Sequence, residues 1–318
     1  MLVSTPALQG VRFSMATNHS GRTRQRNGIA IGEGAIRKIF PAFVLLMWIT
    51  AGIWIANGQW TTLNTILALE ALAICSVVFV NFVHVFNFGY AACVVVLNTT
   101  ILVAKGAPLG SIIVGGLLMI YGIRLFTFVA NRYRHASYAQ RRAGTVIAHK
   151  QLPLPIKILL LINTATLMTF HAMTTYNVAT KAADEGNSGL NGWLIIGGLV
   201  LAQGIAIEAR ADYEKQQVKR NNGDKWISSG LFARTRHPNY LGEIMMQVGV
   251  ILCGIGAASN WYGYAAGFLA PTYIIILMLS ATTGGEKSKR DKYSEDPEFR
   301  AYLRRSNALL PKFRKVNV

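Results

Sequence analysis

Ten residues in the last third of the chain, RTRHPNYLGE from Arg234 to Glu243, concentrate polar chemistry between two apolar stretches. Pro238 suits the first turn of a helix, because the N–H group that proline lacks would have no partner there. Arg234, Arg236 and His237 therefore lie at the predicted start of a helix. Free backbone N–H groups and guanidinium groups both bind anions, so the segment predicts an anion site. The polar side chains that follow in the same helix are Asn239, Tyr240 and Glu243.

Two flanking segments supply further polar groups. Upstream, Glu208 and Asp212 are four residues apart and so share one face of a helix, and NNGD after them predicts a turn. A ligand with several phosphates and hydrogen-bonding rings would suit the polar and basic side chains of these segments. Neither GxGxxG after a strand nor GxxxxGK[ST] is present, so a membrane helix bundle would have to hold any nucleotide. Downstream, EKSKRDKY contributes Lys287, Lys289, Arg290 and Tyr293.

Ionisable side chains also occur inside long apolar runs, where burial of a charge is costly and such residues are usually functional. They are Glu70, His84 and Arg124, and Tyr121 precedes Arg124 by three residues, on the same helix face. Each has a structural alternative: Arg124 could snorkel, Tyr121 could be an interface aromatic, and Glu70 could pair with a neighbouring cation. Together they indicate one buried polar cavity that opens to the cytoplasm.

Composition indicates the class of protein that must position these groups. The 318 residues are 52% hydrophobic and only 14% charged, where a soluble domain carries about 25% charged residues. Basic residues occur in blocks between apolar runs, which favours membrane loops over a nucleic-acid surface. We therefore expect an all-α polytopic membrane helix bundle of about eight spans, with seven as the alternative. The predicted spans are Ile39–Ala56, Thr61–Phe82, Phe88–Val103, Leu109–Val129, Ile156–Thr175, Gly192–Ile207, Tyr240–Gly256 and Trp261–Ser280.

The distribution of lysine and arginine predicts topology, because these residues favour cytoplasmic loops. Eight spans with both termini cytoplasmic satisfy every loop, whereas seven would put one basic end on the wrong side. Residues 1–38 form a basic, disordered tail in this interpretation, with a transit peptide as the alternative. Residues 39–318 form a single membrane domain, with cytoplasmic loops at 130–157 and 208–239 and a basic tail from 282. The three cysteines and six histidines have no metal-ligand spacing, so no metal and no disulfide are expected.

The stretch GLFARTRHPNYLGE, with IEARAD before it and EKSKRDKYSEDPEFRAYLRRSNALLP after it, resembles the C-terminal domain of the steroid 5-alpha-reductase (3-oxo-5-alpha-steroid 4-dehydrogenase) superfamily. The similarity is greatest to a poorly characterised branch of that superfamily, a domain of unknown function. It runs from about Asn81 to Phe313. Two features depart from the branch: VHVFNFG replaces VDxxWG, with His84 at the position of the acid, and YGIRL replaces WGLRL. These departures bear on the substrate more than on the cofactor.

The resemblance implies a cytoplasm-facing NADPH site between helices and an apolar substrate that enters from the lipid. The implied reaction is hydride transfer to a conjugated C=C bond of a steroid- or isoprenoid-like enone. Tyr121 corresponds to the tyrosine that contacts the substrate carbonyl, and Glu70 or His84 is the candidate that positions it. Carried over by motif, the cofactor residues are Arg124, Arg132, Asp212, Asn222, Arg234, Arg236, His237, Asn239, Tyr240 and Glu243, with Lys289 and Tyr293 as looser matches.

Two other functions remain open at this stage. Isoprenylcysteine carboxyl methyltransferases share RHPxYxG and a basic tail, so an S-adenosylmethionine-dependent membrane methyltransferase is the first alternative. A sulfonium ligand carries no phosphate and does not need the six cationic groups predicted around the pocket, which are Arg124, Arg132, Arg234, Arg236, Lys287 and Lys289. A non-catalytic lipid-binding membrane protein that keeps only the fold is the second alternative. The oligomeric state, the substrate and the host membrane do not follow from the sequence.

Overall fold

The computed structural model describes residues 33–221 and 226–312, and within these ranges the chain is helical without a β-strand. Eight helical segments are long and apolar enough to cross a membrane. The predicted all-α bundle of eight spans is therefore confirmed, and the protein is an integral, multi-pass membrane protein. Side chains such as Leu45, Trp48, Ile195 and Leu199 are exposed on outer faces, as expected for surfaces in contact with lipid.

The first half of the bundle contains α1 (Glu33–Ala56), α2 (Thr62–Cys75), α4 (Tyr90–Ala104) and α5 (Leu109–Arg134). The second and third predicted spans, Thr61–Phe82 and Phe88–Val103, are separated by five residues in the sequence. In the structure the boundary between them lies between a 3₁₀ turn that ends at Phe79 and the short α3 (Phe82–His84), which continues through a π-helical turn, Val85–Gly89, into α4. The third span therefore begins six residues earlier than the predicted Phe88.

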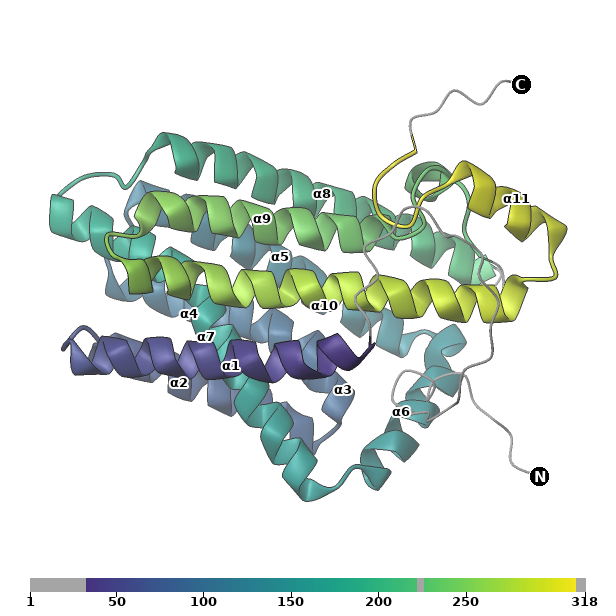
Figure 1. The fold of residues 1–318 in the computed structure, drawn as a ribbon, viewed down its shortest axis with the longest axis horizontal. Helices are drawn as coiled ribbons and strands as arrows, with labels where there is room; N and C mark the ends of the chain where they lie inside the picture. The colour runs from purple at the N-terminus through teal and green to yellow at the C-terminus, as the bar shows by residue number, and fades with distance from the viewer. Residues whose placement is uncertain (1–32, 222–225, 313–318) are drawn as a thin grey trace.

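The second half contains α6 (Ala139–Gln151), α7 (Leu154–Glu185), α8 (Gly192–Asn221), α9 (Pro238–Ala257), α10 (Trp261–Tyr293) and α11 (Pro297–Arg305). In Figure 1, α8, α9 and α10 lie side by side with nearly parallel axes. The short helices α6 and α11 lie at one end of the bundle, where α1 also begins (Figure 1). We refer to this end as the polar end.

Several helices extend beyond their predicted spans, among them α1, α5, α7, α8 and α10. In α1, α8 and α10 the sequence criterion stops where charges begin, whereas the backbone stays helical. Helix α8 runs on through Arg210–Asn221 and α10 through Glu286–Tyr293, so these parts of the predicted loop and tail are helical. Helix α1 likewise begins at Glu33, inside the predicted N-terminal tail. Of the expected turn at NNGD, Asn221 is the last described residue of α8, and the other three residues lie outside the described ranges.

Glycines bring α8 and α9 unusually close together. A Cβ atom added to Gly204 would lie 2.6 Å from the carbonyl oxygen of Gly242, and one added to Gly242 would lie 2.7 Å from the backbone nitrogen of Glu208. Such contact between helix backbones needs residues without side chains. It places the acidic face of α8 directly against the polar first turns of α9.

The RTRH segment is held by the C-terminal tail. The backbone N–H groups of Arg236 and His237 donate to the carbonyls of Asn307 (2.9 Å) and Ala308 (3.0 Å). Gly230 adopts a φ of 57°, a backbone conformation that favours glycine, and Pro238 occupies the first turn of α9 as expected. The entry to α9 is thus fixed by backbone contacts with residues about seventy positions downstream.

Candidate functional site

A buried carboxylate, that of Glu243 on α9, lies at the centre of a network of hydrogen bonds. The Tyr121 hydroxyl on α5 donates to Oε2 at 2.5 Å, and the Tyr90 hydroxyl on α4 donates to Oε1 at 2.9 Å. Gln247 Nε2 also donates to Oε1, at 2.9 Å. Nε2 of His171, on α7, lies 3.0 Å from Gln247 Oε1. Four helices therefore contribute side chains to one polar network inside the apolar bundle.

Helical spacing explains how the network is assembled. Glu243 and Gln247 are four residues apart on α9, and Tyr121 and Arg124 are three apart on α5, so each pair shares a face. The guanidinium carbon of Arg124 lies 5.1 Å from the centre of the Tyr121 ring. The expectation that Tyr121 and Arg124 share one face is confirmed, and Tyr121 is 1% exposed.

Arg124 connects this network to α8. Its Nη2 donates to Glu208 Oε1 at 2.7 Å and its Nη1 to Asp212 Oδ2 at 2.8 Å. Two buried atoms beside these ion pairs, Arg124 Nε and Glu208 Oε2, have no hydrogen-bond partner among residues 33–221 and 226–312. Unpaired buried polar atoms are costly in protein interiors, so they mark a position where a polar ligand group would be stabilised.

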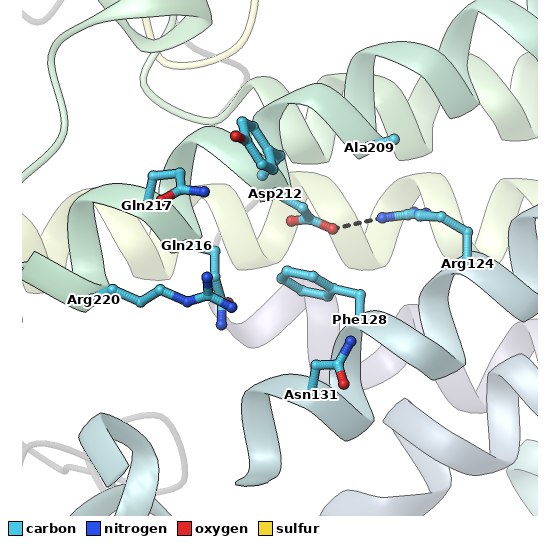
Figure 2. Close-up of a pocket in the computed structure, with 9 residues that line it drawn as sticks. Arg124, Phe128, Asn131, Ala209, Asp212, Gln216, Gln217 and Arg220 are labelled. Carbon is cyan, nitrogen blue, oxygen red and sulfur yellow. Dashed lines mark hydrogen bonds and ion pairs between the residues drawn. The ribbon is translucent and has the colours of Figure 1, made fainter. Parts of the chain in front are cut away.

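A pocket of about 170 Å³ opens between α5 and α8 beside Arg124. Figure 2 shows Arg124 reaching across to Asp212, with Phe128 and Asn131 on α5 facing α8. The pocket is therefore lined by a charged pair, Arg124 and Asp212, and by the aromatic ring of Phe128. The remaining lining residues are Ala209, Tyr213, Gln216, Gln217 and Arg220.

Cations gather next to this pocket, towards the polar end. The charges of Arg132 and Arg141 act on Lys215, and the charge of Lys215 acts on Lys289. Arg132 Nε is buried and has no hydrogen-bond partner in the part of the chain that the structure describes. Helices α5, α6, α8 and α10 thus direct positive charge to one region, through residues other than those of the anion site predicted at the start of α9.

Arg236 and His237 have partners within the protein. Arg236 donates from Nε to Glu286 Oε1 and Oε2 (both 2.9 Å), and from Nη1 to the backbone oxygen of Ser306 (2.6 Å). His237 Nε2 lies 3.1 Å from Glu286 Oε1. Burial lowers the pKa of His237 to about 4, while the hydrogen bond to Glu286 acts in the opposite direction. His237 is therefore neutral at pH 7. Arg236 was expected to line the cofactor pocket, but here it joins α9, α10 and the tail.

The expected positioning partners of Tyr121 were wrong. Glu70 Oε1 accepts a hydrogen bond from Thr100 at 2.9 Å, and His84 packs edge-on against Phe88 and Tyr133. Glu243 takes the place that the sequence interpretation gave to these two residues. The physical reason is the rotation of α9 about its own axis. The close glycine contact between α8 and α9 turns Glu243 towards α5.

The other predicted cofactor residues occupy several environments. Arg234 is exposed, and Asn239 is half-buried at the start of α9. Tyr240 stacks on His237 with ring centres 5.1 Å apart. Lys289 donates to the Arg236 backbone oxygen at 3.0 Å, and Tyr293 packs in an aromatic cluster with Trp226 and Phe299. Asn222 lies outside the described residues.

Three members of the network were not singled out in the sequence: Tyr90, His171 and Gln247. His171 carried a usable signal, because it is an ionisable residue within an apolar span, like Glu70. Gln247 follows Glu243 by one helical turn, and that spacing could have drawn attention to it. Tyr90 had no such signal, since tyrosine is common in membrane helices.

These features define a class: an integral, all-α membrane protein in which a buried carboxylate binds two tyrosines beside a polar pocket. The chain belongs to the family described as protein of unknown function (DUF1295), whose model matches residues 74–306. That match includes every residue of the Glu243 network. No curated protein and no solved structure matches the chain.

Proposed function

We propose that the protein is a membrane-embedded, NADPH-dependent reductase that transfers hydride to the conjugated C=C bond of a lipophilic, steroid- or isoprenoid-like enone. The observation that carries this proposal is the 2.5 Å hydrogen bond between Tyr121 and the buried carboxyl of Glu243, directly behind Arg124 and its pocket. The resemblance of RTRHPNYLGE and its flanking segments to steroid 5-alpha-reductases supports the same reaction.

The residues at the pocket fit a dinucleotide. Arg124 Nε and Arg132 Nε are buried donors without partners, and such donors suit phosphate or amide oxygens. Asp212 could accept hydrogen bonds from ribose hydroxyls. Pockets for whole small-molecule ligands measure about 300–1,000 Å³, so the 170 Å³ beside Arg124 suits one end of the cofactor. The remainder would lie over Lys215 and its cationic neighbours. When bound, NADPH supplies the hydride.

Tyr121 and Glu243 would transfer a proton to the substrate carbonyl oxygen. As hydride reaches the β-carbon of an enone, negative charge develops on the carbonyl oxygen, and a donor to that oxygen lowers the barrier. When Glu243 carries the shared proton, Tyr121 can accept from Glu243 and donate its own proton to the carbonyl. The new O–H bond then forms as the Tyr121 O–H bond breaks, and Glu243 restores the phenol. The enol product becomes the saturated ketone.

The first test is cofactor binding to purified protein in detergent. NADPH and S-adenosylmethionine are titrated separately by calorimetry. The Arg132→Met variant should bind NADPH more weakly by about 1.5–3 kcal/mol, the usual loss for a charged hydrogen bond. Arg134→Met is the matched control, because Arg134 is exposed on the same helix. Binding of S-adenosylmethionine alone would support the methyltransferase instead, and binding of neither ligand would support a non-catalytic lipid-binding protein.

The second test is turnover of NADPH with a panel of steroid 4-en-3-ones and isoprenoid enones. Tyr121→Phe should lower turnover by on the order of 10²-fold or more, because it removes the proton donor. Its NADPH affinity should stay at the parent value, since Phe keeps the ring next to Arg124. A Tyr121→Phe protein with parental turnover would remove Tyr121 from the reaction.

A further inference from the structure

The two oxygens of Glu243 have different partners. Oε1 accepts from both Tyr90 and Gln247, whereas among the described residues Oε2 accepts only from Tyr121, over the shortest distance in the network. Gln247 Nε2 also lies 3.3 Å from the Tyr90 hydroxyl. The amide of Gln247 therefore engages one side of the carboxyl, and the proton of Tyr121 faces the other side.

The orientation of the Gln247 amide depends on His171. An amide group has a donating and an accepting end. With His171 Nε2–H donating to Oε1 over 3.0 Å, the NH₂ group of Gln247 must face Glu243. If the amide were reversed, its oxygen would face the carboxyl oxygen at the same 2.9 Å, which is repulsive unless Glu243 carries the proton on that side. His171 and Gln247 are 1% and 0% exposed, so neither side chain is in contact with bulk water.

We propose that His171 is a positioning residue for Tyr121. By fixing the Gln247 amide, it saturates Glu243 Oε1 with two donors and confines the shared proton to Oε2 and Tyr121. This inference deepens the proposed function, on which it rests, because it makes Tyr121 rather than Tyr90 the tyrosine that passes a proton. The charged groups that act on the network from neighbouring helices are Arg124 on α5 and Glu208 on α8.

The signature of the shared proton can be measured without a substrate. A proton in a short hydrogen bond gives a far-downfield proton resonance, which we would record for the purified parent protein in detergent micelles. Tyr121→Phe and Glu243→Gln should each abolish this signal and so identify it. His171→Phe should shift or abolish it, because phenylalanine keeps the ring that contacts Tyr90 edge-on at 6.2 Å but cannot donate to Gln247.

Two further variants separate positioning from packing. His171→Gln restores an N–H donor of similar reach and should return the signal towards the parent position. Thr175→Val is the matched control on the same helix: it removes a buried 2.6 Å hydrogen bond to Asn98, outside the network, and should leave the signal unchanged. Thermal unfolding of each variant would show that its fold is retained. A parental signal in folded His171→Phe would overturn the inference.

The outcomes distinguish failure of the reductase proposal from failure of the positioning role of His171. If the signal responds to His171 as expected but the parent protein oxidises no NADPH with any enone, the reductase proposal fails and the positioning role stands. If the parent is active, His171→Phe should lower turnover by on the order of 10²-fold, the usual effect of misplacing a reacting group, with an unchanged KM for NADPH. Turnover and signal that both remain parental would refute the positioning role alone.

Discussion

Removal of the Arg124 side-chain charge should destabilise the protein substantially. Arg124 forms ion pairs with Glu208 and Asp212, whose side chains are 8% and 10% exposed. An Arg124→Met substitution keeps the apolar stem but leaves two buried carboxylates without their cation. Breaking a buried pair from one side costs about 3–5 kcal/mol. Because the Arg124 side chain is itself 20% exposed, we expect the lower value, about 3 kcal/mol.

The assay is thermal unfolding of purified variants in detergent. A loss of about 3 kcal/mol should lower the unfolding midpoint by roughly 6–12 °C. The triple variant that also carries Glu208→Gln and Asp212→Asn should recover most of the loss, because no buried charge is left unpaired. The matched control is Arg210→Met, which removes the largely exposed partner of Glu214 on the same helix and should cost at most about 1 kcal/mol.

The two outcomes distinguish electrostatics from packing. If Arg124→Met unfolds at the parental temperature, the two carboxylates are neutral or hydrated, and the reasoning from burial is wrong. If the triple variant is no more stable than Arg124→Met, the loss comes from packing of the guanidinium against Tyr121 rather than from unpaired charge.

Four further expectations follow from the same geometry. Arg236→Ala should cost about 3–5 kcal/mol, because it opens a buried ion pair, and limited proteolysis should then cleave the C-terminal tail faster than in the parent. The pKa of His237 is about 4 in the folded protein and 6.5 when unperturbed. The contribution of neutral His237 to the free energy of unfolding should therefore be fully present above pH 6.5 and should fall by about 3 kcal/mol as the pH drops towards 4. Thermal unfolding measured against pH should show this slope, and His237→Gln should flatten it. Gly242→Ala should cost about 1–3 kcal/mol, since its Cβ would lie 2.7 Å from the Glu208 nitrogen, whereas Gly116→Ala, with nothing within 4 Å, should unfold at or above the parental temperature. Reporter fusions at the two ends of the chain should both report the cytoplasmic side, and opposite sides would contradict the even number of spans.

The membrane bundle could be predicted from sequence because hydropathy and length are local properties. Each span is recognisable as a run of about 20 mostly apolar residues, and no contact with another span is needed to recognise it. The same holds for Pro238 at the start of α9 and for the shared face of Tyr121 and Arg124, which depend only on the geometry of one helix. The end of α10 was missed because charged residues can remain helical beyond the lipid, whereas the helical continuation of α8 past its predicted span was expected from the spacing of Glu208 and Asp212.

The partners of the functional side chains depend on how the helices are rotated against one another, and no local pattern encodes that rotation. Tyr121 and Glu243 are 122 residues apart, and they meet because glycine contacts press α9 against α8 and turn Glu243 inward. Arg236 and Arg132 were both predicted as cofactor residues by resemblance, yet Glu286, fifty residues downstream, neutralises Arg236, while Arg132 keeps a donor next to the pocket that has no partner among the described residues. Residue type and spacing therefore indicated which groups could do chemistry, and the packing of distant helices selected which of them face one another.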